Sequence, residues 1–263
     1  MRADYPVAIA DLILGLANWR IWGRLGWLEV KRRYRRTVLG PIWVTLTLAI
    51  FCFAMGLVYA ELFHREIKTY LPFLTTGMVC WGLVSGITNE GCSTYASAEN
   101  LIRQLKFPLV TLNCIVIWRN IIVLAHNMII VIVILIFFPV PINLALLLFI
   151  PGVLIIAVNG LWATMVLGMV SVRFRDIPPL VSSLVTAVLF ITPIFWPPDQ
   201  LGASSKIITF NYFYHLTNLI RAPLLGETPT LESYLITIGG AVVGGIATIA
   251  IYARFRQRVA YWL

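Results

Sequence analysis

The stretch IIVLAHNMIIVIVILIFFPV, residues Ile121–Val140, decides the fold class of this chain. It contains no Asp, Glu, Lys or Arg, and it has about the 20 residues that a helix needs to cross a bilayer. Its side chains do not alternate between apolar and polar, as the strands of a membrane barrel would. Because a bilayer offers no water to backbone groups, the remaining solution is a helix. The stretch therefore predicts a membrane-spanning α-helix.

The composition of the whole chain extends this prediction. Of 263 residues, 60% are hydrophobic and 12% are charged, against about 25% charged in an average soluble domain. We predict an all-α integral membrane protein with six spans, made of residues 1–37 as a cytoplasmic N-terminal segment and residues 38–263 as one transmembrane domain. The predicted spans are Ile42–Ala60, Tyr70–Thr88, Ile121–Val140, Leu144–Val172, Leu180–Phe195 and Leu235–Tyr252.

The net charge of +9 is explained by membrane orientation rather than by nucleic-acid binding, because the basic residues lie mostly beside the apolar stretches. With a cytoplasmic N-terminus, sixteen of the 20 Lys and Arg residues fall on the cytoplasmic side and four on the other. This bias follows the positive-inside rule. We therefore expect both termini in the cytoplasm, which requires an even number of spans.

The segment before the first span has the pattern of an amphipathic interface helix. Basic residues recur on one stripe at Arg20, Arg24, Lys31 and Arg35, with Tyr34 adjacent. An apolar stripe beside it contains Ile21, Leu25 and Leu28. Such a helix can lie in the headgroup layer with its charges toward anionic lipids. Two interpretations remain open, a simple topology signal and a helix that helps to hold a cytoplasmic partner.

A second amphipathic helix is predicted in the cytoplasmic loop Ala98–Pro108. Glu99 and Arg103 are spaced i, i+4, and Leu101, Ile102 and Leu105 share one face. Phe107-Pro108 ends the helix. A short helix of this kind suits docking into a groove of another protein, and an ordinary surface helix is the alternative.

Motifs that would give the chain its own chemistry are missing. The sequence contains no G-x-x-x-x-G-K-[ST] phosphate loop and no G-x-S-x-G motif. Its three histidines have no metal-ligand spacing, and the predicted spans contain no carboxylate for a proton or sodium relay. We therefore expect no catalytic residue, no metal and no cofactor in this chain, so that active transport would depend on a separate motor.

Four blocks of the sequence resemble the permeases of type-2 ABC exporters, most closely the polysaccharide subgroup that exports O-antigen, capsule or teichoic-acid chains. The blocks are YRRTVLGPIW at 34–43, NLIRQLKFP at 100–108, VRFRDI at 172–177, and ITPIFW at 191–196 followed by NYFYH at 211–215. They follow the order of the family over nearly the whole chain. One position departs from the pattern, because Tyr212 stands where the family has proline, and this puts the local turn geometry in question.

The resemblance implies a permease subunit in the bacterial cytoplasmic (inner) membrane that exports a lipid-linked polysaccharide. It implies a homodimer surrounded by membrane lipids and bound to two copies of a separate ABC ATPase, which would hold ATP and Mg. The family's coupling helix corresponds here to Asn100, Leu101, Ile102, Arg103, Leu105, Lys106 and Phe107, with the cytoplasmic turn Arg173, Arg175 and Asp176 as a further contact.

Aromatic and helix-breaking residues are the candidates for the pore and its extracytoplasmic gate, because aromatic faces stack on sugar rings and broken helices line cavities. We expect short re-entrant helices within Phe195–Leu225. The candidates are Trp43, Phe51, Tyr59, Trp81, Pro193, Phe195, Trp196, Asn211, Tyr212 and His215. Two alternatives stay open, a type-2 ABC permease for a drug or small lipid and an intramembrane glycosyl or lipid transferase.

Overall fold

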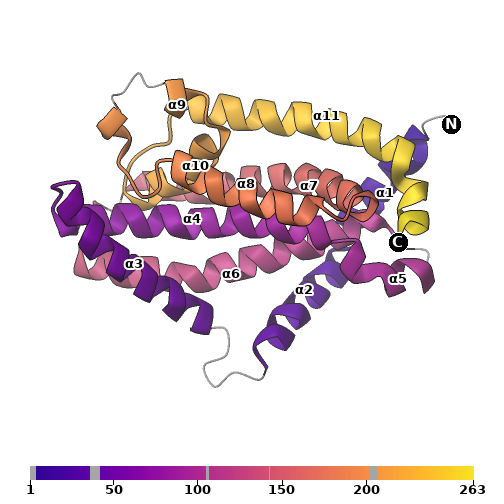
Figure 1. Cartoon of the computed structure of the whole chain (residues 1–263), viewed down its shortest axis with the longest axis horizontal. Helices are drawn as coiled ribbons and strands as arrows, with labels where there is room; N and C mark the ends of the chain where they lie inside the picture. Colours follow the sequence, from indigo (N-terminus) through magenta and orange to yellow (C-terminus); the bar gives the residue numbers. More distant parts are fainter. Residues whose placement is uncertain (1–3, 36–41, 105–106, 142, 202–205) are drawn as a thin grey trace.

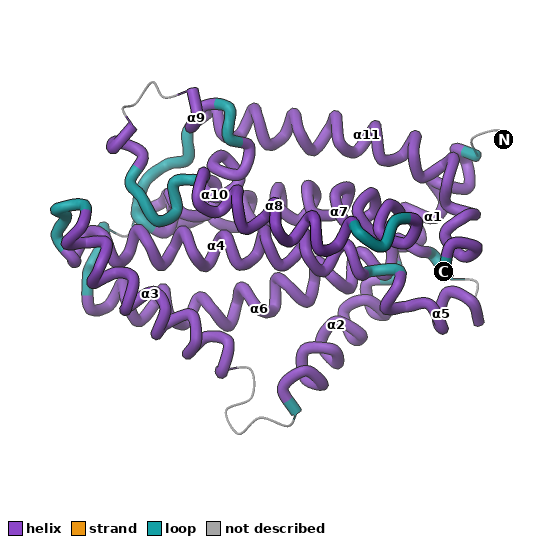
Figure 2. Tube along the Cα trace, in the orientation of Figure 1, coloured by secondary structure: helices purple, strands orange, loops and turns teal. Residues whose placement is uncertain are grey.

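The computed structural model describes residues 4–35, 42–104, 107–141, 143–201 and 206–263. In these ranges every regular element is a helix, and the remainder is turn or loop (Figure 2). The α-helices are α1 (Tyr5–Ala17), α2 (Trp19–Tyr34), α3 (Ile42–Leu62), α4 (Ile67–Ser93), α5 (Glu99–Gln104), α6 (Leu109–Phe137), α7 (Phe149–Arg173), α8 (Ile177–Ile191), α9 (Lys206–Thr209), α10 (Tyr212–Leu224) and α11 (Leu231–Trp262). Short 3-10 helices are η1 (Ala96–Ala98), η2 (Leu144–Leu148) and η3 (Pro198–Leu201).

Local sequence sets where several helices begin. Side chains of Asp4, Asn211 and Thr230 accept hydrogen bonds from backbone N–H groups in the first turns of α1, α10 and α11. These residue types are favoured caps because they satisfy donors that the helix itself leaves unpaired. Prolines occupy the first turn of α8, where a missing N–H costs nothing.

The all-α membrane fold is confirmed, since five helices of the described chain are long and apolar enough to cross a bilayer. They are α3, α4, α6, η2 with α7, and α11. The fifth predicted span, Leu180–Phe195, corresponds to α8, which has 15 residues. A helix of that length covers roughly 22 Å, less than the hydrocarbon core of about 30 Å. The count of six spans therefore stays a prediction.

The predicted boundaries were wrong for three helices. α11 continues past the predicted Tyr252 to Trp262. α6 begins at Leu109, well before the predicted Ile121, and α4 continues past Thr88 to Ser93. The extra turns contain Glu90 and Arg119, charges that we took as outside the helices. In the structure these two residues form an ion pair at 2.7 Å, and pairing allows both to remain inside helical turns.

The long helices run side by side between two ends of the molecule (Figure 1). α1, α5, the last turns of α11 and the turn between α7 and α8 lie at one end, which we call the terminal end. α9 and the start of α11 lie at the opposite end, the distal end. α1 and the C-terminus thus share one side of the bundle, the arrangement that an even number of crossings requires.

α4 is the central helix of the bundle, and α3 and α11 are peripheral. α4 packs against α3, α6, α7, α8 and α10. Within the 18-residue apolar stretch of each helix, 67% is buried in α4, against 17% in α3 and 11% in α11. The outward faces of α3 and α11 carry exposed aliphatic side chains such as Val58 and Val243. Such faces suit contact with lipid tails or with another membrane helix.

Candidate coupling site

α5 is the short amphipathic helix predicted from the loop after the second span. Leu101 and Ile102 are half-buried and pack against a core cluster contributed by α6, α7 and α11. Asn100 and Arg103 are exposed, and Arg103 pairs with Glu99 at 2.9 Å. Leu105 and Lys106 lie outside the described residues. Phe107, which follows α5, packs on the same cluster.

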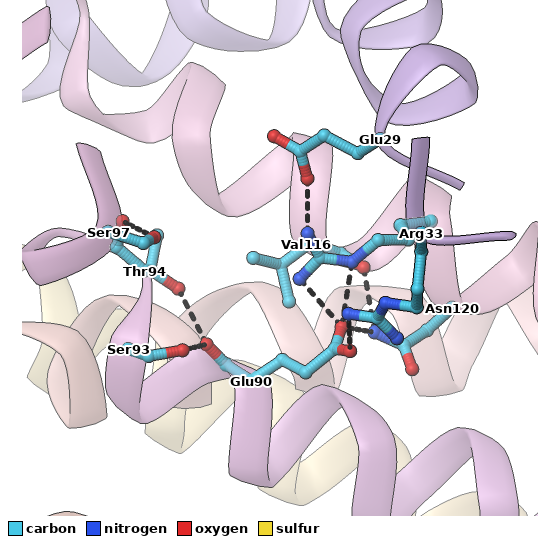
Figure 3. A network of polar contacts seen from close by, with 9 residues as sticks. Glu29, Arg33, Glu90, Ser93, Thr94, Ser97, Val116 and Asn120 are labelled. Carbon is cyan, nitrogen blue, oxygen red and sulfur yellow. Dashed lines mark hydrogen bonds and ion pairs between the residues drawn. The ribbon is translucent and has the colours of Figure 1, made fainter. Parts of the chain in front are cut away.

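Upstream of α5, the end of α4 is fixed by the carboxylate of Glu90 (Figure 3). Arg119 of α6 donates to Oε2 of Glu90 from Nε at 2.9 Å and from Nη2 at 2.7 Å. Asn120 donates to the same oxygen at 2.7 Å. Glu90 and Arg119 are mostly buried, so each charge depends on the other for its stabilisation.

Helix α2, which we predicted to lie at the membrane interface, reaches the same carboxylate. Arg33 donates to Oε1 of Glu90 at 2.8 Å, and Glu29 accepts from Nη1 of Arg119. About two turns before Glu29 in α2, Trp22 packs edge-to-face on Trp118 of α6 at 5.8 Å. The polar cluster Glu29–Arg33–Glu90–Arg119 therefore joins α2, α4 and α6, and we refer to it as the Glu90 cluster.

The chain between the Glu90 cluster and α5 is itself held by hydrogen bonds. Ser93 and Thr94 donate to the carbonyl of Glu90 at 3.0 and 3.3 Å, and Ser97 donates to the carbonyl of Thr94 (Figure 3). Tyr95 is fully buried and donates to Asn113 of α6 at 2.9 Å. Burial raises the pKa of the Tyr95 hydroxyl, which keeps this donor protonated. Hydrogen bonds and buried contacts therefore connect the chain before α5 to both α4 and α6.

Downstream of α5, the first turn of α6 is fixed by a second buried carboxylate, that of Asp11 in α1. Asp11 is 4% exposed and accepts from the backbone N–H of Val110 at 3.4 Å. It also accepts from the Tyr252 hydroxyl and, at 2.6 Å, from Arg256, both in α11. A carboxylate is favourable at the start of a helix, where N–H groups are unpaired. We call this the Asp11 cluster, and it joins α1, α6 and α11.

The turn Arg173–Asp176, which we predicted to be cytoplasmic, was the other predicted coupling element. Arg173 ends α7 and lies over the rings of Phe174 and Trp262, at 5.8 and 5.6 Å from their centres. Arg175 and Asp176 are exposed. Between these three residues the described structure contains no ion pair, so the turn presents its charges outward at the terminal end.

The basic stripe of α2 keeps its predicted character. Arg20, Arg24, Lys31 and Arg35 are all exposed, while the side chain of Tyr34 lies outside the described part. The protein-facing side of α2 is formed by other residues, because Gly26 and Val30 are the buried positions. A Cβ at Gly26 would lie 2.9 Å from Trp118, so glycine there permits the close approach to α6.

The predicted pore residues fall into separate groups. Phe51 and Tyr59 of α3 both contact the ring of Phe195, at 6.3 and 5.9 Å between centres. Trp81 is buried in α4 and packs near Phe213. Trp43 stands exposed in the first turn of α3, and the predicted set is therefore not one continuous lining within a single chain.

The short helices expected between the last two spans are present, and α10 carries a polar network. His215 is buried between Ser233 and the carbonyl of Thr209, at 3.0 and 2.9 Å. Asn211 caps α10 by accepting from Tyr214 N–H at 3.1 Å. Tyr212 donates to Asn159 of α7 and lies against Gly240 of α11. The tyrosine in the family's proline position is thus a packing residue.

Two further predicted residues lie beside this network. Pro193 offers its carbonyl to the guanidinium of Arg221 at 2.6 Å. Trp196 donates from its indole to the carbonyl of Phe190 at 3.0 Å. The turn after α8 is therefore tied to α8 itself and to α10.

Sequence reasoning missed the residues that organise the coupling site. We placed Glu90 in a loop, whereas it lies inside α4, and we assigned no role to Arg119 or Asp11. One signal was available, because Asp11 is an isolated charge within the apolar segment Tyr5–Ala17. An ionisable residue in such a place usually has a specific partner, but the partner, at the far end of the chain, is not readable from spacing.

Comparison with known proteins agrees with this architecture. The ABC-2 type transporter family matches residues 22–225. The O-antigen export system permease protein RfbA of Myxococcus xanthus is 26% identical over 186 residues, covering 70% of this chain and 72% of that protein. Two proteins of the same name from Klebsiella pneumoniae are 23% and 25% identical, each covering 88% of this chain and 90% of the relative.

Because the family match covers most of the sequence, the class of the protein is settled: the chain belongs to the ABC-2 type transporter family. It is a membrane-embedded transport protein built from apolar helices.

Proposed function

We propose that this chain is the permease subunit of an ABC exporter that carries a lipid-linked polysaccharide such as O-antigen across the bacterial cytoplasmic membrane. Two copies form the passage, and each binds one copy of a separate ATPase at the terminal end. Both termini are then cytoplasmic. ATP and Mg are held by the ATPase, and this chain supplies no nucleotide site.

The observation that carries the proposal is the similarity to O-antigen export permeases over 88% of the chain. The coupling site supports it independently. α5 turns its charged residues outward, and both of its flanks lead to buried ion-pair clusters. A rigid connection of this kind is what a motor outside the membrane needs in order to shift the conformation of the spans.

The outward faces of α3 and α11 support the homodimer. These helices are the least buried of the five long ones, and the pore candidates Trp43 and Phe51 lie on α3 with substantial exposure. A second copy placed against α3 would bring two sets of aromatic side chains together. Aromatic rings can stack on successive sugar units without a fixed register, which suits a moving polymer.

Deletion of the gene tests the function in cells. The expected result is loss of the surface glycan together with accumulation of lipid-linked glycan in the cytoplasmic leaflet. Unchanged surface glycan, combined with increased sensitivity to apolar drugs, would contradict polysaccharide export and would favour the alternative of a drug or small-lipid permease. Transferase activity of the purified chain alone would favour the intramembrane enzyme.

A further inference from the structure

A small polar cavity lies at the distal end, between the first turns of α4, the turn after α8, and α10. Its volume is about 290 Å³, near the lower limit for small-molecule sites. The lining includes Phe73, Asp199, Tyr214, Asn218, Arg221 and Glu227. By contrast, the cavity between α3, α4 and α6 is lined by aliphatic and aromatic side chains with Thr45 as its polar member.

Arg221 is the residue that makes this cavity unusual. It is 4% exposed, yet within the described ranges no carboxylate lies at ion-pair distance from it. Its Nη1 donates to the carbonyl of Pro193 at 2.6 Å, and its guanidinium carbon lies 4.4 Å from the ring centre of Phe73. Gly77 of α4 lies beside the same group, since an added Cβ would be in ordinary van der Waals contact with Nη1 at 3.5 Å.

These contacts hold the guanidinium in place but engage only part of it. A guanidinium has five N–H donors and no acceptor, and buried donors without acceptors are costly. The contacts of the described residues to Arg221 involve Nη1 and the face of the ion. Because Arg221 lines the cavity, a ligand oxygen bound there can accept from its remaining donors.

The other charges of the lining select against a strongly anionic ligand. Asp199, which is paired with Arg65, and the exposed Glu227 border the same cavity. A phosphate would therefore meet two carboxylates as well as the guanidiniums of Arg65 and Arg221, so the lining has no excess of positive charge for it. Hydroxyl groups both donate and accept, so a polyhydroxylated ligand can serve Arg221 and the carboxylates together. Tyr214 adds an aromatic ring to the same lining.

We infer that this cavity is a subsite for one neutral sugar ring. The inference rests on the proposed function and adds to it, since it assigns a carbohydrate-binding site at the distal end that is built within a single chain. Arg221 donates to ring or hydroxyl oxygens, Asp199 and Glu227 accept from hydroxyls, and Tyr214 packs against the ring. Occupation of the subsite would retain an emerging polymer on the distal side between transport steps.

Binding to the purified full-length chain in lipid nanodiscs tests the inference. Saturation-transfer NMR is recorded with a panel of neutral methyl pyranosides, and phosphorus NMR with inorganic phosphate. The variants are Glu227→Gln, Tyr214→Leu and Arg221→Gln. The control is Glu232→Gln, which changes an exposed acidic residue in the first turn of α11 outside the cavity.

The expected result is transfer to at least one pyranoside in the wild type and in Glu232→Gln, reduced about tenfold in Glu227→Gln and Tyr214→Leu, as loss of one charged hydrogen bond or a packing ring predicts. Arg221→Gln should abolish it. Arg221 also contacts Pro193 and Phe73, so the Arg221 variant can fail to fold. In that case, Glu227→Gln tests whether the cavity binds the pyranoside.

Three outcomes would overturn the subsite: no pyranoside signal in the wild type, signals from the Glu227 and Tyr214 variants that equal the wild-type signal, or binding of phosphate in place of pyranosides. Failure of the subsite is separable from failure of the proposed function. If only the subsite is wrong, deletion of the gene still removes the surface glycan, and Glu227→Gln exports it normally.

Discussion

The two ends of the bundle are held together by different chemistry. At the terminal end, mostly buried carboxylates pair with arginines in the Glu90 cluster and the Asp11 cluster. At the distal end, Asn211 and His215 form hydrogen bonds, Phe195 makes ring contacts, and the buried Arg221 contacts a carbonyl and a ring instead of a carboxylate. The ion pair found there between Arg65 and Asp199 is exposed on both sides.

This difference has a mechanical meaning. Separating a buried ion pair leaves an unpaired charge, which costs several kcal/mol, whereas a cap or a ring contact contributes about 1 kcal/mol. In the proposed transport cycle, the terminal end therefore moves as a unit with the ATPase. The distal end can open at lower cost.

The largest effect is expected from Glu90→Gln. The change leaves Arg119 and Arg33 without their shared carboxylate, and we expect the unfolding free energy to fall by roughly 3 kcal/mol. The measurement is the thermal unfolding midpoint in detergent. Glu29→Gln is the matched control, with an expected loss of about 1 kcal/mol or less, because Glu29 is 40% exposed and Arg119 keeps Glu90. Equal unfolding midpoints for the two variants would show that the Glu90 carboxylate does not stabilise the terminal end more than the exposed Glu29 does.

A close backbone contact at the distal end comes next. A Cβ at Gly152 of α7 would meet the carbonyl oxygen of Leu219 in α10, well inside van der Waals contact. Gly152→Ala is therefore expected to lower stability by about 2 kcal/mol. Gly82→Ala is the control, since nothing lies within 4 Å of an added Cβ there, and it should raise stability by up to about 1 kcal/mol. If Gly152→Ala is as stable as the wild type, α7 and α10 can move apart at no cost to accommodate the added methyl group.

The sequence predicted the membrane fold and α5 because both depend on local patterns. Apolar length marks a span, and the spacing of Glu99, Leu101 and Arg103 marks an amphipathic turn. It failed at Glu90, because a charge near the end of an apolar stretch is read as leaving the membrane. It also failed at Asp11, an isolated charge within the apolar segment Tyr5–Ala17. Their partners Arg119 and Arg256 are distant in sequence, so only the packed structure identifies the pairs.

The candidate pore could be predicted only as a set of residue types. Trp43 and Trp81 share a composition signal, yet Trp43 is 53% exposed and Trp81 is 5% exposed. Aromatic content does not reveal which ring packs inside the chain and which faces outward. The short helices of the distal end were predictable, because proline and asparagine mark helix ends directly.

A smaller effect is expected at the cap of α10. Asn211→Ala removes the acceptor for Tyr214 N–H, and stability should fall by about 1 kcal/mol. Asn211→Asp keeps the capping oxygen and should lose less, although the hydrogen bond that the Asn211 amide donates to Thr192 is given up. The midpoints of the two variants are compared in one detergent. If Asp is as damaging as Ala, the bond to Thr192 rather than the cap holds the distal turn.

The smallest change in stability, and the most informative for coupling, is expected from Arg103→Glu. The exposed pair with Glu99 contributes at most about 0.5 kcal/mol, so the unfolding midpoint should hardly move. Stimulation of the ATPase in the reconstituted complex should nevertheless fall several-fold, because a reversed charge on the outward face of α5 opposes docking. The double variant Glu99→Arg with Arg103→Glu restores the pair within the helix and the net charge. If α5 acts only through its own helical stability, the double variant recovers stimulation. If Arg103 contacts the ATPase, stimulation stays low while the unfolding midpoint remains that of the wild type. That result would mean that the rigid terminal end serves to transmit force from a bound ATPase to the spans.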